Sequence, residues 1–214
     1  KNILVTGGAG FIGSAVTKEL IKKNFDVIVV DNLSKGLLRL VDKKAKFYKL
    51  DLTDNISLEN VFKENKIDVV IHFAAYKAAG ESMTDVVKYS NNIKGTINLL
   101  DCMVKYQVDK IIYSSTAAVY GYPEYLPVDE NHPTKPINYY GFSKLVCENL
   151  IEWYSKIYGI NYVSLRYFNV AGDVGFNYID PEANNIFPVV MEVISGKREK
   201  FIVFGDDYNT RDGT

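Results

Sequence analysis

A glycine-rich turn near the start of the chain constrains its fold more than any other feature. The sequence GGAGFIG, Gly7 to Gly13, follows the apolar run Ile3 to Thr6 and leads into apolar residues at helical spacing. Glycines between a strand and a helix let the backbone approach a pyrophosphate at the positive helix N-terminus. GxGxxG and GxxGxxG registers both fit, and an ordinary glycine-rich turn is the alternative. In this strand–turn–helix setting the sequence predicts a dinucleotide-binding turn.

Apolar strands and helices alternate along most of the chain. Near-continuous apolar strands separated by helices indicate an α/β fold, a Rossmann-type doubly wound parallel sheet covered on both faces. Ligands of such sheets lie beyond the carboxyl ends of the strands. The strands are predicted at 3–6, 26–31, 46–52, 68–75, 109–117 and 161–169, with long helices at 86–106 and 139–158.

The composition changes after Asn169, where Gly, Asp, Asn and Pro become frequent. A helix at 187–194 and a short strand at 201–204 are predicted beyond this segment. We expect a dinucleotide-binding domain over 1–170. Residues 171–214 are expected to begin a smaller C-terminal substrate-binding portion that Thr214 leaves incomplete.

Composition excludes several classes of protein. The 25 Lys and Arg residues nearly balance the 26 Asp and Glu residues, so neither a nucleic-acid nor a membrane surface is expected. Apolar runs are too short for a membrane span or a signal peptide. Cys102 and Cys147 lack a CxxC spacing, which favours buried thiols in a reducing cytoplasm. His72 and His132 lie in unlike contexts, so no metal site is expected.

Asp31 ends the second predicted strand, 18 residues after Gly13. A carboxylate at this position can accept the adenosine ribose hydroxyls and repel a 2′-phosphate, which favours NAD over NADP. No arginine stands among residues 32–35 to reverse that preference. The alternative is a strand-ending Asp that caps the next loop.

The sequence YGFSK places Tyr140 and Lys144 four residues apart on one face of a predicted helix. A phenol with a pKa of about 10 needs about 4 kcal/mol to approach 7. One cation at about 4 Å contributes on the order of 4 kcal/mol at an effective dielectric of about 20. We therefore expect Lys144, with an oxidised nicotinamide, to lower the pKa of Tyr140 and make it a base. The Thr116 hydroxyl could bridge substrate and phenolate, or simply cap a helix.

Five motifs in order, GGAGFIG, HFAAYKAAGES, SSTAAVYG, YYGFSK and LRYFNVAG, together resemble the extended short-chain dehydrogenase/reductases and, among them, the nucleotide-sugar epimerases. The resemblance covers the whole chain. It implies NAD as cofactor, a UDP-sugar as substrate, and inversion of a UDP-hexose at C4 by transient hydride transfer through a 4-keto intermediate.

The resemblance also implies roles for individual residues. Tyr140 corresponds to the catalytic base, Lys144 to its ribose-binding partner, and Thr116 to the hydroxyl of the triad. Cofactor contacts are implied for Gly7, Gly10, Phe11, Ile12, Gly13, Asp31, Asn32, Asp51, Leu52, Phe73, Ala74, Lys77, Asn91, Ser114, Tyr140, Lys144, Tyr167 and Phe168. Sugar-nucleotide contacts are implied for Thr116, Tyr140, Asn169, Asn185, Ile186, Ile202 and Phe204.

Alternatives to an epimerase remain open. Dehydratases that resemble this chain carry Asp-Glu after the Thr, whereas this chain has Ala117 and Ala118, so oxidation and reduction alone are expected. Another epimerase, dehydratase or decarboxylase of the superfamily shares most of the motifs. A non-catalytic NAD sensor has no use for a tuned phenol. The chain could also be a structural Rossmann subunit of an oligomer, which is compatible with catalysis. The resemblance implies a homodimer through the two long helices.

Overall fold

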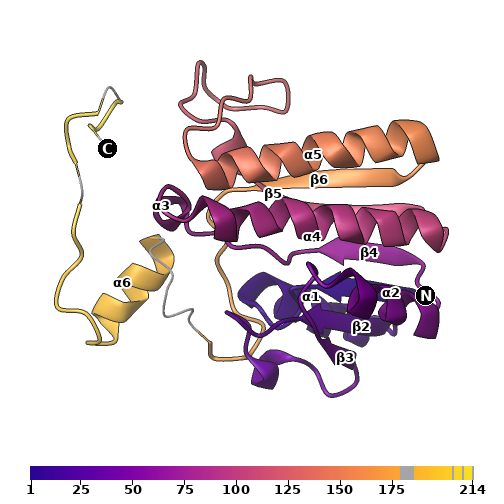
Figure 1. Cartoon of the computed structure of the whole chain (residues 1–214). Helices are drawn as coiled ribbons and strands as arrows, with labels where there is room; N and C mark the ends of the chain where they lie inside the picture. Colours follow the sequence, from indigo (N-terminus) through magenta and orange to yellow (C-terminus); the bar gives the residue numbers. More distant parts are fainter. Residues whose placement is uncertain (179–185, 204, 209, 214) are drawn as a thin grey trace. The chain divides into compact units, whose positions relative to one another are not determined.

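A computed structural model describes residues 1–178, 186–203, 205–208 and 210–213. The chain divides into two compact units, Lys1–Val170 and Ala171–Thr214, which are described separately below (Figure 1).

The first unit is built on a six-stranded sheet in which every pairing is parallel. The strand order is β3–β2–β1–β4–β5–β6, so the direction of winding reverses between β1 and β4. This arrangement confirms the predicted doubly wound α/β fold. The strands are β1 (Asn2–Thr6), β2 (Asp26–Asp31), β3 (Lys46–Lys49), β4 (Val69–His72), β5 (Lys110–Thr116) and β6 (Asn161–Tyr167).

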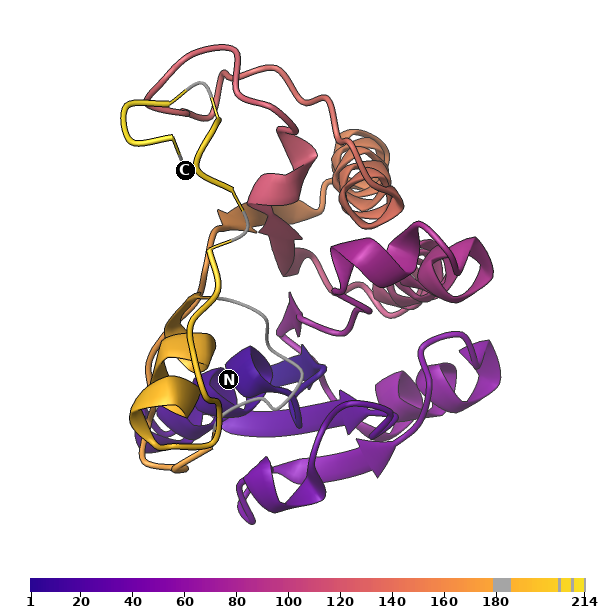
Figure 2. The same ribbon diagram turned by 90° about the vertical axis from the view of Figure 1, so that its left-hand side faces the viewer.

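Helices cover both faces of this sheet. One face packs against α2 (Asn55–Glu64), α4 (Val86–Lys105) and α5 (Tyr139–Tyr158), which lie along the same side in Figure 2. The other face packs against α1 (Phe11–Lys22). A short helix, α3 (Ala79–Ser82), precedes α4, and two 3₁₀ turns, η1 (Leu38–Leu40) and η2 (Ala117–Val119), follow β2 and β5.

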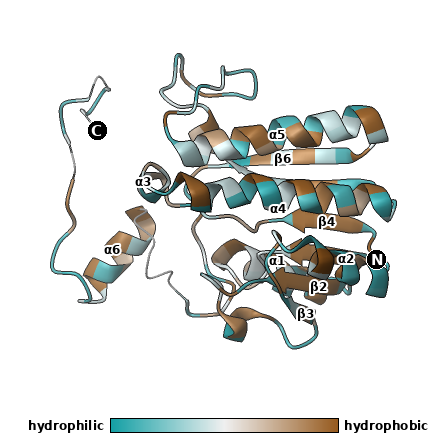
Figure 3. Ribbon diagram, viewed as in Figure 1, coloured by the Kyte–Doolittle hydropathy of each residue, from teal (hydrophilic) through white to brown (hydrophobic). Residues whose placement is uncertain are grey.

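The apolar residues of the strands form the core, and Figure 3 shows β2 and β4 as almost wholly hydrophobic. Leu4 and Val5 are both fully buried although they point to opposite faces of β1. A strand buried on both sides cannot alternate polar and apolar residues, which explains the continuous apolar runs of the sequence.

Side-chain caps define where several helices begin. The Asp54 carboxylate accepts from Ser57 N at 3.1 Å at the start of α2. Asn138 Oδ1 accepts from Gly141 N at 2.8 Å at the start of α5. That helix ends at Gly159, whose φ of 72° is a left-handed conformation that glycine adopts without steric cost. The cap at Asn138 sets the first turn of α5, which carries Tyr140.

Four strands, β3, β4, β5 and β6, are shorter than predicted, and β3 and β4 differ most. β3 and β4 end where the strands beside them, β2 and β1, end. β3 stops at Lys49, which pairs with Asp31, the last residue of β2. β4 stops at His72, which pairs with Thr6, the last residue of β1. The residues that follow each strand are therefore released at one edge of the sheet.

The second unit contains the helix α6 (Ile186–Ile194). Pro188 lies in its first turn, where a missing N–H is tolerated. The predicted strand at 201–204 is wrong over 201–203, where the structure has no regular element, and residue 204 lies outside the described residues. An isolated apolar run has no partner strand to pair with among the described residues of this unit.

Candidate active site

The glycine turn between β1 and α1 can only be made by glycine. Gly7 has a φ of 70°, and a Cβ on it would lie 2.6 Å from the Ala74 nitrogen. A Cβ on Gly13 would lie 2.2 Å from the Gly7 carbonyl oxygen. Gly7 thus brings the end of β1 against the residue that follows β4, at the point where the strand order reverses. Ligands of doubly wound sheets bind at this point.

The N-terminus of α1 fits a pyrophosphate. Its N-cap is Gly10, with no side-chain cap from the described residues and no acidic residue in the first turn, which contains Phe11 and Ile12. Helix N-termini of this kind favour anions because the helix dipole and the first N–H groups point toward them. The predicted Gly7, Gly10 and Gly13 are brought together here.

Asp31 ties the glycine turn to the end of β2. Its carboxylate accepts from Ala9 N at 3.0 Å and from Leu33 N at 2.8 Å. Asp31 therefore caps the next loop, as the alternative interpretation predicted. It also lies beside the glycine turn, which is compatible with the predicted contact with the adenosine ribose. Asn32 Nδ2 donates to Asp51 Oδ2 at 2.7 Å, so three predicted adenosine-side residues lie at one edge. Burial acts against ionisation of Asp51, but hydrogen bonds from Thr53 and Asn32 lower its pKa.

Leu52 differs from its neighbours because its side chain is buried in the core rather than presented at the sheet edge. It packs under α4, where a Cβ on Gly95 would lie 2.9 Å from the Leu52 Cβ. Its carbonyl accepts from Asn98 Nδ2 at 2.8 Å. Any cofactor contact of Leu52 must therefore come from its backbone.

Tyr140 and Thr116 meet at the carboxyl end of β5. The Thr116 side chain acts on the Tyr140 phenol and lowers its pKa. The Thr116 oxygen also accepts from Ala118 N at 3.2 Å, so it caps η2 as the alternative interpretation predicted. The Tyr140 backbone N–H donates to Ser82 Oγ at 3.0 Å, which anchors the first turn of α5 to α3.

Lys144 lies one turn further along α5 and is 2% exposed. Its ammonium lies 4.6 Å from the centre of the Tyr113 ring, a cation–π contact. Burial lowers the pKa of Lys144 to about 8, although Cys147 and Glu148 oppose this. The sequence motif did not show that the amine would be this deeply buried.

The residues of the chain do not by themselves lower the pKa of Tyr140, and the prediction for this phenol included the charge of an oxidised nicotinamide as well as that of Lys144. Burial raises the pKa of this phenol above its usual value, and only the Thr116 side chain opposes the change. The spacing of Tyr140 and Lys144 does not show the cost of placing a phenolate in a partly buried site, which opposes the effect of the amine. A positive charge at the site beyond that of Lys144 is needed to make Tyr140 a base.

The remaining predicted residues lie in strands, in the segments that follow strands, or in α4. Ala74 N donates to Thr6 Oγ1 at 3.4 Å, which holds Phe73 and Ala74 beside β1. Phe168 and Asn169 are exposed after β6. The others are Lys77, exposed in the loop after β4; Asn91, in α4; Ser114, in β5; and Tyr167, at the end of β6.

Four predicted substrate residues belong to the region after 170. Ile186 begins α6 and is 53% exposed, and Ile202 is 50% exposed. Asn185 and Phe204 lie outside the described residues.

A buried polar network beneath the site was not predicted. His72 Nδ1 lies 2.6 Å from Thr6 Oγ1, and its Nε2 lies 3.0 Å from Thr96 Oγ1. Burial and the positive charge of Lys144 lower the pKa of His72 to about 3, so the ring is neutral. Its place inside an apolar strand was a signal that it is a satisfied core histidine. Among the described residues, no cluster of His, Cys, Asp and Glu could hold a metal.

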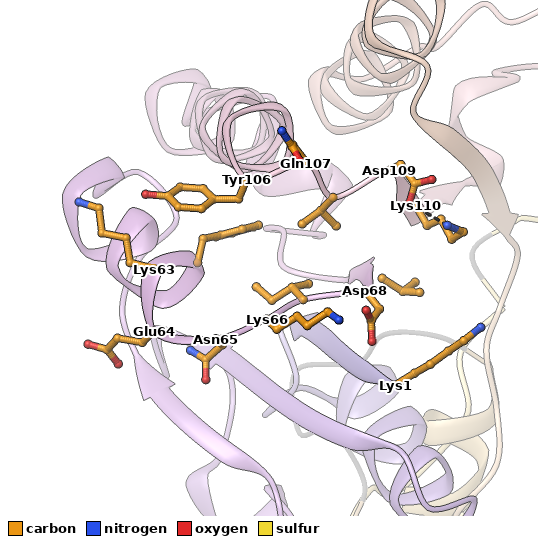
Figure 4. A pocket seen from close by; sticks show the side chains of 14 residues that line it. Lys1, Lys63, Glu64, Asn65, Lys66, Asp68, Tyr106, Gln107, Asp109 and Lys110 are labelled. Carbon is orange, nitrogen blue, oxygen red and sulfur yellow. Dashed lines mark hydrogen bonds and ion pairs between the residues drawn. The ribbon is translucent and has the colours of Figure 1, made fainter.

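A cavity of about 600 Å³ opens at the opposite edge of the sheet (Figure 4). It is lined by the starts of β4 and β5 and the ends of α2 and α4, including Asp68, Asp109 and Lys110. None of the predicted site residues lines this cavity. It is remote from the glycine turn because amino and carboxyl ends of parallel strands lie at opposite edges.

Comparison with known proteins decides the family. The model of the NAD dependent epimerase/dehydratase family matches residues 3–213. The chain belongs to this family. Its relatives in the family include a UDP-glucose 4-epimerase of Streptococcus mutans, 48% identical over 99% of this chain and 66% of that protein. The chain spans about two thirds of the length of the curated relatives it matches.

Solved structures of the epimerase/dehydratase family superpose closely on this one. UDP-glucose 4-epimerase from Brucella ovis, in complex with NAD, matches with a TM-score of 0.92 and 40% identity over 99% of this chain and 66% of that chain. The enzyme from Bifidobacterium longum, in complex with NAD⁺ and UDP, matches with a TM-score of 0.90 and 42% identity over 100% of this chain and 68% of that chain. No helix among the described residues is long and apolar enough to cross a membrane.

Proposed function

We propose that this protein is an NAD-dependent isomerase that inverts the C4 hydroxyl of a UDP-hexose and interconverts UDP-glucose and UDP-galactose. The observation that carries the proposal is that the Thr116 side chain acts on the Tyr140 phenol, while the Lys144 amine is buried one turn further along the same helix. The names of the relatives, UDP-glucose 4-epimerases, support the same reaction.

The residues present fit a dinucleotide. The close approaches at Gly7 and Gly13 leave room only for backbone in the turn, and α1 directs an uncapped N-terminus toward it. We propose that this turn holds the pyrophosphate and that Asp31 and Asn32 hold the adenosine ribose. The further cofactor contacts predicted from the sequence are proposed on the same basis. When bound, NAD supplies a hydride acceptor and donor and a positive nicotinamide charge.

In this proposal each residue of the chain has a separate task. Thr116 orients the 4-hydroxyl of the sugar toward Tyr140, because its side chain is close enough to the phenol to lower the pKa of that group. Tyr140 takes the hydroxyl proton and later returns it. Lys144 stabilises the phenolate and binds the nicotinamide-side ribose. Two alanines, Ala117 and Ala118, follow Thr116, so no carboxylate is present there to eliminate water.

Further proposals concern the substrate-binding region, the oligomeric state and the cellular location of the protein. Residues 171–214 are proposed to begin the substrate-binding region, with Asn169, Asn185, Ile186, Ile202 and Phe204 near the sugar nucleotide. A homodimer through α4 and α5 is supported by apolar side chains exposed on them, with Val87 77%, Trp153 61% and Ile157 64% exposed. We place the protein in the cytoplasm because its two cysteines are both buried free thiols.

Incubation with UDP-galactose tests the function. The NAD-loaded protein is expected to form UDP-glucose without added NAD, because reduced cofactor must return its hydride before it leaves. Release of water or carbon dioxide from a UDP-sugar substrate would assign the chain to the dehydratases or decarboxylases of its family. Bound NAD with no turnover of any UDP-sugar would indicate a sensor instead.

A further inference from the structure

The carboxylate of Glu148 is buried behind the candidate active site, with only 8% of the residue exposed. It accepts from Arg166 twice, from Nε at 3.1 Å and from Nη2 at 2.8 Å, and from the Ser115 hydroxyl. A two-pronged contact between a guanidinium and a carboxylate fixes orientation as well as distance. Glu148, Arg166 and Ser115 are called the carboxylate clamp below.

Each member of the carboxylate clamp is close in sequence to a candidate site residue. Glu148 lies one turn after Lys144 on α5, and Ser115 immediately precedes Thr116 on β5. Arg166 immediately precedes Tyr167 on β6 and pairs with Ser115 in the sheet. The clamp therefore joins the three elements that present the base, the hydroxyl and the residue proposed to flank the nicotinamide.

The carboxylate clamp also reaches the segment after η2. Arg166 Nη1 donates to the Tyr120 hydroxyl at 3.1 Å, and the guanidinium carbon lies 4.9 Å from the centre of the Tyr120 ring. The His132 and Tyr120 rings meet nearly at right angles, with their centroids 5.4 Å apart. One arginine thus orders both the end of β6 and the turn that follows Thr116.

Stability alone is a weak reason for such a cluster. Replacing a buried ion pair with apolar residues of similar volume is often neutral or stabilising, because the desolvation of two charges offsets their attraction. The carboxylate clamp is therefore expected to add little to stability. Because it holds α5, β5 and β6 in a fixed register, it is suited to positioning the site residues that these elements carry.

We propose that Glu148 is a positioning residue for Lys144 and Thr116: through Arg166 and Ser115 it fixes where α5 and β5 hold these two residues relative to Tyr140. This inference rests on the proposed function, since it assigns Glu148 to the same reaction.

Glu148 also has an electrostatic effect on Lys144, which follows from the charged and titratable groups around this amine. His72 faces the amine from β4, Tyr113 from β5, and Cys147 from α5 itself. Among the described residues, Glu148 is the carboxylate that raises the pKa of Lys144 against burial. Loss of its charge should therefore favour the neutral amine.

The test compares Glu148→Gln with Glu59→Gln in the full chain. Glu59 is a matched control because it also has three partners, Lys63 Nζ at 2.7 Å, Lys105 Nζ at 3.0 Å and the Tyr106 hydroxyl at 3.0 Å, but it joins α2 to α4 far from Tyr140. We expect E148Q to lower kcat for UDP-galactose by about 10- to 100-fold with KM changed less than about threefold. We also expect a narrower pH profile of kcat, and E59Q should change neither.

A second readout does not depend on turnover. The pKa of Lys144, measured by ¹³Cε-lysine NMR and assigned with Lys144→Arg, should fall in E148Q and stay unchanged in E59Q. If the wild-type protein fails to convert UDP-galactose, the proposed function fails, while this titration still tests the coupling of Glu148 to Lys144. Unchanged kcat, pH profile and Lys144 titration in E148Q would overturn the inference.

The double variant Glu148→Met with Arg166→Met separates positioning from folding. The double variant leaves no unpaired charge in the carboxylate clamp. If E148Q lowers the melting temperature, the double variant should therefore restore it toward the wild-type value. A stable double variant with kcat still reduced supports positioning. Recovery of both stability and kcat would show that Glu148 serves the fold alone and would overturn the inference.

Discussion

Replacing Lys144 by methionine is expected to stabilise the fold while removing activity. Burial lowers the pKa of this amine to about 8 from its ordinary value of 10.5. Near pH 7 both the folded and the unfolded chain carry the proton, so folding bears the full cost of the buried charge. That cost is about 3 kcal/mol, at about 1.4 kcal/mol per pKa unit. The shifted pKa contains all interactions of the charged amine, so Lys144→Met should gain up to about 3 kcal/mol at pH 7.

The pH dependence gives the prediction a distinct signature. Between pH 8 and pH 10.5 the folded wild-type protein releases the Lys144 proton while the unfolded chain still binds it. Wild-type stability therefore rises with pH across this window. Methionine keeps the apolar stem and carries no charge, so the advantage of Lys144→Met should shrink as the pH rises.

Urea unfolding at pH 7 and at pH 9.5 measures this advantage. Lys94→Met, at an exposed position on α4, is the matched control and should change the free energy of unfolding by less than about 0.5 kcal/mol at both values. A Lys144→Met variant that is less stable than the wild-type protein at pH 7, or an advantage that does not depend on pH, would refute the reasoning.

Other predictions concern single groups of the site. Tyr140→Phe should lower kcat by about 10²- to 10⁴-fold in a UDP-galactose assay while NAD titrates as before, and unchanged turnover would exclude this phenol as the base. Gly13→Ala should cost about 3 kcal/mol or more of unfolding free energy because its Cβ would lie 2.2 Å from the Gly7 carbonyl oxygen, whereas Gly80→Ala, with nothing within 4 Å of its Cβ, should be nearly neutral. Asp31→Ala should weaken NAD binding by about tenfold or more and reduce its preference over NADP in equilibrium titrations, and equal affinity would contradict the ribose assignment.

Local patterns were sufficient to predict the sheet and the glycine turn. The apolar run before Gly7 and the two long amphipathic helices are periodic over many residues, and the structure confirms them. The shorter helices α2 and α3 were not predicted from the sequence. The early ends of β3 and β4 follow from where β2 and β1 end, which is a property of pairing and not of the segment itself.

The electrostatics of the site could not be predicted in the same way. The spacing of Tyr140 and Lys144 places them on one face of α5, but it does not show how much water each retains. Burial decides the direction of both pKa values. The partnership of Glu148 with Arg166 joins residues from different elements and depends on the packing of α5 against β6.

The fate of the hydrogen at C4 tests the central claim most directly. UDP-galactose that carries deuterium at C4 is converted to UDP-glucose by the full chain in ordinary water, and the product is examined by mass spectrometry and NMR. Transfer as a hydride, with Tyr140 handling only the hydroxyl proton, predicts that the deuterium stays at C4 of the product. Its loss to water would mean that C4 is deprotonated, and it would contradict the roles assigned to Tyr140 and to the dinucleotide turn.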